Sequence, residues 1–189
     1  MTLTKLYHTV EDRGNPDEIE ATSPFICKRK DVWLGEGYYF WDTFIENAHW
    51  WGKTIYSSKG YVVVEHSCAF SSDKCFDLLG NMEHLKEFTA AVEFLEKREL
   101  LRKQSSTVAQ IIEFLKKSTD FEKKYEAIRA YGQKSKSSTE LRIVPFVLGK
   151  NQYLDCTPAV QLCLFRKNSL KLSSGKIIYP THYIEGYTI

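Results

Sequence analysis

The sequence lacks the features that mark several specialised classes of protein. Its 189 residues include five cysteines, an odd number, and no two of them have the CxxC spacing. This pattern argues against a disulfide framework and against a zinc site, and it favours a reducing cytoplasm. No apolar run is long enough to span a membrane, and the N-terminal residues lack the charged start and apolar stretch of a signal peptide. We therefore expect a cytoplasmic protein that binds neither a membrane nor a metal.

An excess of one charge is also nearly absent. The chain has 26 Lys and Arg residues against 24 Asp and Glu, and its net charge of +2 gives no strong field for nucleic acid. The hydrophobic content of 43% and the length fit one soluble domain with a sizeable core. Aromatic residues make up 14%, and all four tryptophans (33, 41, 50 and 51) lie in one short segment. Such a cluster is typical of a ligand cleft or of a densely packed corner of the core.

The N-terminal region alternates between strand and helix patterns. Residues 3–9, 37–41 and 61–66 predict three strands, the last because it is a run of β-branched residues. Asp42 is a candidate N-cap, since its carboxylate can accept hydrogen bonds from the free backbone N–H groups of a following helix. Apolar residues at helical spacing predict that helix over about 43–52.

The middle of the chain differs in character from both ends. Three apolar stripes at helical spacing predict a helical insertion at about 82–132, and a Ser/Lys-rich linker follows at 133–140. Strand patterns then return at 141–148, 159–165, 176–179 and 183–189. We therefore expect a single α+β domain over residues 1–189, with strands at both ends and helices between them.

The most informative segment runs Trp33-Leu34-Gly35-Glu36-Gly37-Tyr38-Tyr39-Phe40-Trp41-Asp42. It resembles the Gly-x-Gly-x-Tyr-Phe-x-Asp motif of ADP-ribosyltransferases of the diphtheria-toxin and poly(ADP-ribose) polymerase type. Those enzymes also carry His-Gly-Thr on a first strand, where this chain has Tyr7-His8-Thr9. The resemblance covers residues 33–52 and 7–9, and it does not extend to the helical insertion.

The resemblance implies a fold and an activity. The fold is two small packed β-sheets around an NAD cleft. The activity is transfer of ADP-ribose from NAD, as a substrate, to a protein or nucleic-acid acceptor, with release of nicotinamide. The chain would then be a mono-ADP-ribosyltransferase, which belongs to the glycosyltransferases. Bacterial relatives of this class often act as toxins or effectors.

The resemblance also assigns roles to residues on the first two strands. His8 takes the position of the histidine that contacts the adenosine ribose, although a strand-end histidine with satisfied nitrogens is the alternative. Thr9 replaces the glycine whose backbone clamps the nicotinamide amide. Gly37 belongs to the glycine pair that opens the second strand. Tyr39 matches the tyrosine that stacks against nicotinamide.

Further positions follow on the helix after the second strand. Asn47 falls where the family often has a serine that binds the carboxamide of nicotinamide. Trp50 takes the place of the second stacking aromatic residue, and an indole face suits a cationic ring.

The third element of the site departs from the family pattern. The strand over 159–165 puts Gln161 at the position of the catalytic glutamate. Glutamine can hydrogen-bond a ribose hydroxyl, but it supplies no negative charge to an oxocarbenium-like transition state and removes no proton. Asp155 and Glu185 are the nearest acidic substitutes in sequence, and each is also explained as an ordinary solvated carboxylate.

Three functions therefore remain open at the level of sequence. The first is an NAD-using ADP-ribosyltransferase with Tyr39 and Gln161 in its catalytic site. The second is a catalytically silent module that binds NAD or ADP-ribose and recruits a partner through the helical insertion. The third is an RNA 2′-phosphotransferase, which would need a basic cleft to hold phosphate.

Overall fold

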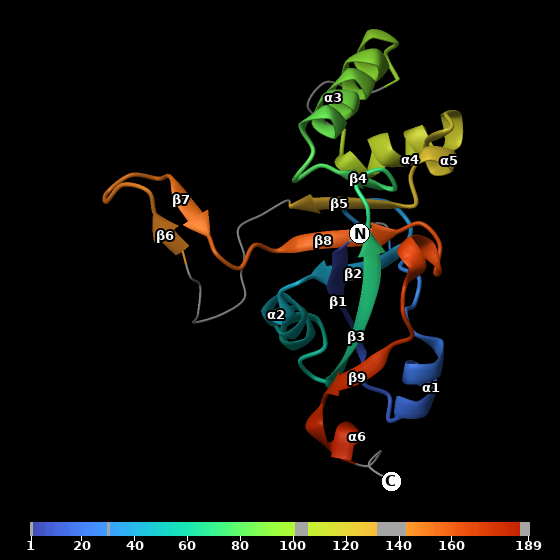
Figure 1. Cartoon of the computed structure of the whole chain (residues 1–189), viewed down its shortest axis with the longest axis vertical. Coiled ribbons are helices and arrows are strands. Elements are labelled where there is room, and N and C mark those ends of the chain that lie inside the picture. Colours follow the sequence, from blue (N-terminus) through green and yellow to red (C-terminus); the bar gives the residue numbers. More distant parts are fainter. Residues whose placement is uncertain (1, 30, 101–105, 132–142, 186–189) are drawn as a thin grey trace.

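The strands of this computed structural model form one sheet of seven strands and one of two (Figure 1). The structure describes residues 2–29, 31–100, 106–131 and 143–185. The strands are β1 (Thr2–Glu11), β2 (Tyr38–Asp42), β3 (Tyr61–Phe70), β4 (Cys75–Asp77), β5 (Ala127–Tyr131), β6 (Ile143–Pro145), β7 (Tyr153–Asp155), β8 (Val160–Leu164) and β9 (Lys176–Tyr179). The large sheet has the order β4-β5-β8-β2-β1-β3-β9, and β6 pairs with β7 alone.

The helices gather at the two ends of this sheet and beside its middle. They are α1 (Pro16–Thr22), α2 (Ile45–Ile55), α3 (Met82–Lys97), α4 (Val108–Ser118), α5 (Phe121–Lys124), α6 (Thr181–Glu185) and a short 3₁₀ turn, η1 (Ser169–Lys171). Helices α3, α4 and α5 lie beyond the β4–β5 edge, and α1 and α6 lie at the β9 end (Figure 1). Helix α2 packs on β1, β2 and β3. The mixed α+β class predicted from the sequence is confirmed, with one large sheet and a hairpin in place of two small sheets.

The large sheet buries apolar side chains on both faces. Because successive residues of a strand point to opposite faces, Leu6, Phe40 and Leu162 share one face and pack with Cys68. Tyr7 and Trp41 lie on the other face and pack against Ala48 of α2. The tryptophans are therefore divided between core packing and the cavity described below.

The segment predicted to be a helical insertion is helical only in part. Helices α3 and α4 coincide with the first two apolar stripes, and Thr107 caps α4 through a capping box. The third stripe ends its helix, α5, at Lys124 and then forms β5, which pairs with β4 and β8. Ala127 and Ile128 are fully buried in the sheet, so strand pairing overrides the helical spacing there. The predicted linker over 133–140 lies outside the described residues.

Two other expectations from the sequence are corrected. Helix α2 begins at Ile45 with no side-chain cap, because the Asp42 carboxylate instead accepts hydrogen bonds from Arg129 (2.6 Å) and from the Thr43 hydroxyl (2.8 Å). The predicted strand over 183–189 is helix α6 as far as residue 185, and residues 186–189 lie outside the described part of the chain.

The β6–β7 hairpin stands away from the large sheet (Figure 1). Val144 and Leu154 are direct partners in its ladder, and both are about half exposed. At its tip, Phe146, Val147 and Leu148 are 58% or more exposed. These side chains therefore contribute little to the core of the protein.

Candidate functional site

A cavity of about 340 Å³ lies over the middle of the large sheet. Four residues assigned to the site from sequence line it, namely His8, Thr9, Tyr39 and Gln161. They come from three neighbouring strands, β1, β2 and β8. The cavity is covered by residues 25–29 and 31–33, which we call the wall segment. Aromatic residues make up much of the remaining lining: Tyr7, Phe25, Trp33, Trp41, Trp51 and Tyr56.

The cavity lies where β1 and β2 separate. Their ladder has only two residue pairs, Leu6 with Asp42 and Tyr7 with Trp41. Beyond Tyr7, β1 continues on β3 as far as Glu11, while β2 stays paired with β8. Beyond the Tyr7–Trp41 pair, β1 stays hydrogen-bonded to β3 and β2 stays hydrogen-bonded to β8, but β1 and β2 no longer pair with each other. The space between these two strands and the wall segment forms the cavity.

His8 spans this separation with both of its ring nitrogens. Nδ1 donates to the Tyr39 carbonyl oxygen (2.8 Å), and Nε2 accepts from the Phe25 backbone N–H (3.2 Å). Burial lowers the pKa of His8 to about 4, which keeps the ring neutral with its proton on Nδ1. Neither nitrogen is free for a ribose hydroxyl. In this structure His8 joins the wall segment to the strands, and a contact with a ribose hydroxyl would require one of these two hydrogen bonds to be exchanged.

Tyr39 is held by the loop that carries the glycine pair. Its hydroxyl donates to the Gly35 carbonyl oxygen (2.7 Å) and accepts from the Leu34 N–H (2.9 Å). Burial raises the pKa of this hydroxyl, so it stays protonated. The Tyr39 side chain lies on the opposite face of the sheet from His8, in the cluster that contains Leu34 and Cys163. Tyr39 can offer a ring to a ligand, but it cannot act as a base.

Thr9 is anchored to the helix behind the cavity. Its hydroxyl donates to the Ala48 carbonyl oxygen of α2 (3.1 Å). The side chain that replaces the family's glycine is thus turned to α2 and tied down there. This contact explains how a β-branched residue is accommodated at this position.

Gln161 contributes a side-chain amide to the lining of the cavity. On β8 it is paired with Trp41 on one side and with Ala130 on the other. It is 8% exposed, and its carboxamide makes no hydrogen bond to any residue that the structure describes. The amide atoms of Gln161 are not among the fully buried polar atoms that lack a partner, so they remain accessible from the cavity. Gln161 is therefore available to a ligand that enters the cavity.

The structure does not bring the other three predicted residues to the cavity. Gly37 packs on β8, where an added Cβ would lie 2.4 Å from the Cys163 sulfur. Asn47 is fully buried, and its amide donates to the Pro158 carbonyl oxygen (3.1 Å). Trp50 packs edge-on against Trp41, and its neighbour Trp51 lines the cavity in its place. Helical spacing alone does not distinguish positions 50 and 51, which lie about 100° apart around α2.

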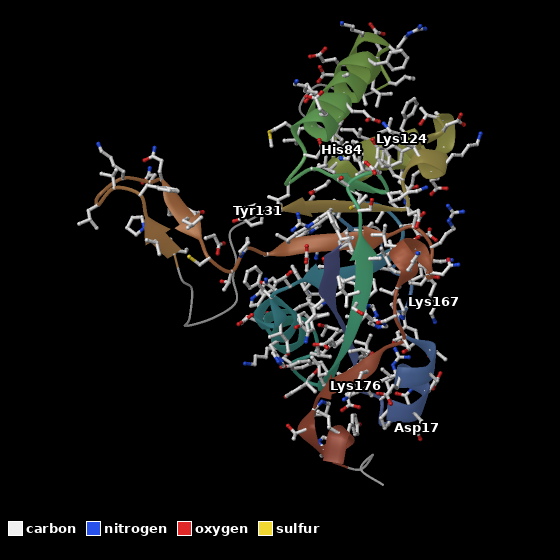
Figure 2. The ribbon with its side chains drawn as sticks, viewed as in Figure 1. Asp17, His84, Lys124, Tyr131, Lys167 and Lys176 are labelled. Carbon is white, nitrogen blue, oxygen red and sulfur yellow. The ribbon has the colours of Figure 1, made fainter. Side chains whose placement is uncertain are left out.

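Asp155, one of the two acidic substitutes for the missing glutamate, does not line the cavity. Asp155 accepts hydrogen bonds from the Thr157 N–H (3.0 Å) and the Tyr131 hydroxyl (3.3 Å). Tyr131 marks the end of β5 nearest the β6–β7 hairpin (Figure 2). Glu185 ends α6 at the far end of the sheet (Figure 1), and its side chain lies outside the described part.

The wall segment supplies functional groups that sequence reasoning missed. Lys28, Arg29 and Asp31 line the cavity from it, and they are the charged lining residues among those described. Arg29 holds Asp31 through two parallel hydrogen bonds, and its guanidinium lies 6.0 Å from the centre of the Trp51 ring. A basic and an acidic residue two positions apart in a polar loop gave no signal in the sequence, because such pairs are common on protein surfaces.

The described residues give no sign of a metal site or of a membrane-spanning helix. Among them, no three His, Cys, Asp or Glu side chains converge where a metal ion could be held. No helix of the same residues combines the length and apolar character needed to cross a bilayer.

Comparison of the chain with protein-family models, with curated proteins and with solved structures returned no match. The assignment of a function therefore depends on the residues of the cavity and on their chemistry.

Proposed function

We propose that the protein binds NAD in the cavity between β1 and β2 and uses it as a donor of ADP-ribose. The observation that carries this proposal is the unpartnered carboxamide of Gln161, which opens into a cavity that Tyr39 and Thr9 also line. The three residues are far apart in sequence, and the motif resemblance selected all three. A lining rich in aromatic residues with a few polar groups is typical of small-molecule sites of this volume.

The chemistry of transfer asks for few groups from the protein. The bond between C1′ of the ribose and the nicotinamide nitrogen breaks, and its electron pair leaves with nicotinamide. A nucleophilic atom of the acceptor then bonds to C1′ and loses its proton to solvent. Aromatic faces favour the cationic nicotinamide ring in the ground state. The Gln161 amide hydrogen-bonds the ribose 2′-hydroxyl and fixes the sugar.

The proposed enzyme is slow, because no carboxylate lies beside Gln161. Among the described lining residues, Asp31 is the acidic one, and Arg29 neutralises it. Loss of an electrostatic group that stabilises a transition state costs roughly 10²-fold or more in rate. The same observation favours a second candidate function, an NAD-binding module without turnover. An RNA 2′-phosphotransferase is less well supported. It needs a basic cleft, and Lys28 and Arg29 are the two basic side chains among the described lining residues.

The test combines NAD binding with release of nicotinamide. Trp41 and Trp51 line the cavity, so NAD should quench tryptophan fluorescence and give a dissociation constant. Gln161→Ala should weaken binding several-fold and abolish turnover. Gln161→Glu should raise nicotinamide release on the order of 10²-fold. Gln152→Ala, in the exposed hairpin, is the control and should behave like the unmodified protein.

The outcomes separate the two candidate functions. Binding with no nicotinamide release from any variant would identify the silent module. Absence of NAD binding to the unmodified protein would refute the proposal altogether. If release does occur, mass spectrometry of co-expressed protein and RNA for an added ADP-ribose identifies the acceptor. All five cysteines are free thiols, and we propose the reducing cytoplasm as the place where the protein acts.

A further inference from the structure

We infer that Arg29 binds the diphosphate of the ligand, and that Asp31 occupies this position until the ligand displaces it. The inference rests on the proposed function, since it names the part of NAD that the wall segment holds. It extends to any ligand in which a diphosphate is joined to a group that fits the cavity, such as ADP-ribose.

Arg29 binds Asp31 through two nitrogens of its guanidinium, an arrangement that can also bind two oxygens of a phosphate. Nε of Arg29 lies 2.9 Å from Oδ1 of Asp31, and a terminal nitrogen lies 2.7 Å from Oδ2. A guanidinium presents the same planar fork to a carboxylate and to two oxygens of a phosphate. The fork is thus already formed and directed, and an anionic ligand can replace the carboxylate without rearranging the arginine.

The arginine is also positioned by its other neighbour. Its guanidinium lies over the ring of Trp51 at 6.0 Å from the ring centre, within the distance of cation–π contacts. Trp51 belongs to α2 and lines the cavity. The stacked indole keeps the guanidinium at the cavity when Asp31 leaves.

Displacement of Asp31 costs little. The side chains of Arg29 and Asp31 are 51% and 68% exposed, and exposed ion pairs contribute little to stability because water screens them. A released Asp31 carboxylate is solvated where it stands. A diphosphate brings two negative charges to the same fork, so the exchange favours the ligand.

The remaining charges of the wall segment point to Arg29 as the residue that binds the diphosphate. Lys28 lies 3.7 Å from Glu36, on the loop that carries the glycine pair. His8 is uncharged, with both nitrogens bonded. Arg29 is therefore the cationic residue, among the described lining residues, that already holds an anionic group through two hydrogen bonds.

The experiment compares three ligands on four proteins by calorimetry. The ligands are NAD, ADP-ribose and nicotinamide riboside, of which the last has no phosphate. The proteins are the unmodified chain, Arg29→Ala, Asp31→Asn and the control Arg13→Ala. Arg13 is matched to Arg29 because it is exposed and pairs with Glu11, two positions away, but does not line the cavity.

We expect Arg29→Ala to weaken NAD and ADP-ribose at least tenfold and to leave nicotinamide riboside unchanged. Asp31→Asn removes the competing carboxylate and should tighten both diphosphates two- to fivefold. Unchanged thermal unfolding of each variant shows that the fold is intact, as the exposure of both side chains predicts.

Equal affinity of Arg29→Ala and the control for ADP-ribose would overturn the inference while leaving NAD binding in place. Weaker binding of NAD and ADP-ribose to Asp31→Asn would show that Asp31 supports the ligand and does not compete with it. That result would overturn the inference that the ligand displaces Asp31. Loss of nicotinamide riboside binding in Arg29→Ala would show a structural role instead. If no ligand binds the unmodified chain, the proposed function itself has failed.

Discussion

The imidazole of His8 and the main chain of Tyr39 are joined by a hydrogen bond, with Nδ1 2.8 Å from the Tyr39 carbonyl oxygen. The resemblance selected both residues as ligands of NAD. In the structure both residues form hydrogen bonds within the protein. His8 accepts from the Phe25 N–H, and the Tyr39 hydroxyl bonds to Gly35 and Leu34. The two residues therefore shape the cavity before any ligand is present.

Replacement of His8 should damage the fold as well as the cavity. His8→Ala removes a buried ring and leaves the Phe25 N–H and the Tyr39 carbonyl oxygen without their partner. We expect a loss of about 3 kcal/mol in the free energy of unfolding, measured by urea denaturation. His182→Ala, at an exposed position of α6, should change it by less than about 0.5 kcal/mol. Equal stability of the two variants would show that the hydrogen bonds of His8 to Phe25 and Tyr39 do not stabilise the fold.

Stability should also fall in mild acid because of His8. Its pKa is lowered from 6.5 to about 4, so the folded state binds fewer protons than the unfolded state within this window. The contribution is complete above pH 6.5 and is lost as the pH falls towards 4, on the order of 3 kcal/mol in total. Burial also lowers the pKa of His66, which adds to the loss.

The measurement is urea denaturation at several pH values between 7 and 4.5. The unmodified protein should lose stability steadily across this range. His8→Gln keeps a polar side chain and removes the titrating group, so its curve should be flatter. A curve parallel to that of the unmodified protein would place the acid sensitivity elsewhere.

Part of this fold follows from local patterns in the sequence. The strands predicted over residues 3–9 and 37–41 and in the β-branched run at 61–66 correspond to β1, β2 and β3 of the structure. Helices α3 and α4 follow from apolar stripes, which report a buried face directly. The strand β5 could not be found in this way, because Ile128 and Tyr131 also fit the helical stripe that begins at Phe121. Its strand conformation comes from pairing with β8, whose paired residues lie 29 to 37 positions later, from Tyr131 with Val160 to Ala127 with Leu164.

The candidate site shows the same limit. The motif selected four residues that line the cavity and three that do not, because it did not give the direction of each side chain. Trp51 reaches the cavity and Trp50 does not, and this depends on how α2 is rotated against β1. Residues 25–29 and 31–32 of the wall segment carried no recognisable motif, and the segment is fixed at Phe25 by a hydrogen bond to His8, which is distant in sequence.

A substitution at Gly37 tests whether this position must be glycine because of packing against β8 or because of contact with a ligand. An added Cβ would lie 2.4 Å from the Cys163 sulfur and 2.6 Å from the Leu164 carbonyl oxygen. Gly37→Ala should therefore destabilise the protein by about 1–3 kcal/mol through overpacking. The paired variant Gly37→Ala with Cys163→Ala should recover part of the loss, as thermal unfolding will show. No recovery would mean that the Leu164 backbone is the obstacle.

The exposed hairpin tip should be neutral for stability. Leu148 is 88% exposed and Phe146 is 70% exposed, so Leu148→Ser or Phe146→Ser removes little buried area. Each should change the free energy of unfolding by less than about 0.5 kcal/mol. A larger loss in either variant, measured at several protein concentrations, would show that the tip is buried in an assembly in solution.

The strongest effect is expected at Arg129, which lies between two buried carboxylates. Its Nε is 2.6 Å from Asp42, and a terminal nitrogen is 3.4 Å from Asp77. Arg129→Met keeps the length of the side chain and removes the charge, so that both carboxylates remain buried without a counter-ion. Breaking a buried ion pair in this way costs about 3–5 kcal/mol.

Arg166→Met is the matched control, because Arg166 is exposed and its guanidinium donates to the Glu122 carbonyl oxygen (3.4 Å) and to no carboxylate among the described residues. The double variant Arg129→Met with Asp42→Asn separates charge from packing. Removing one stranded carboxylate should restore a measurable part of the stability lost in the single variant, and a double-mutant cycle gives the coupling. Strict additivity of the two changes would mean that Asp42 and Arg129 do not interact in solution, and that the ladders of β8 with β2 and with β5, together with apolar packing, hold this part of the sheet.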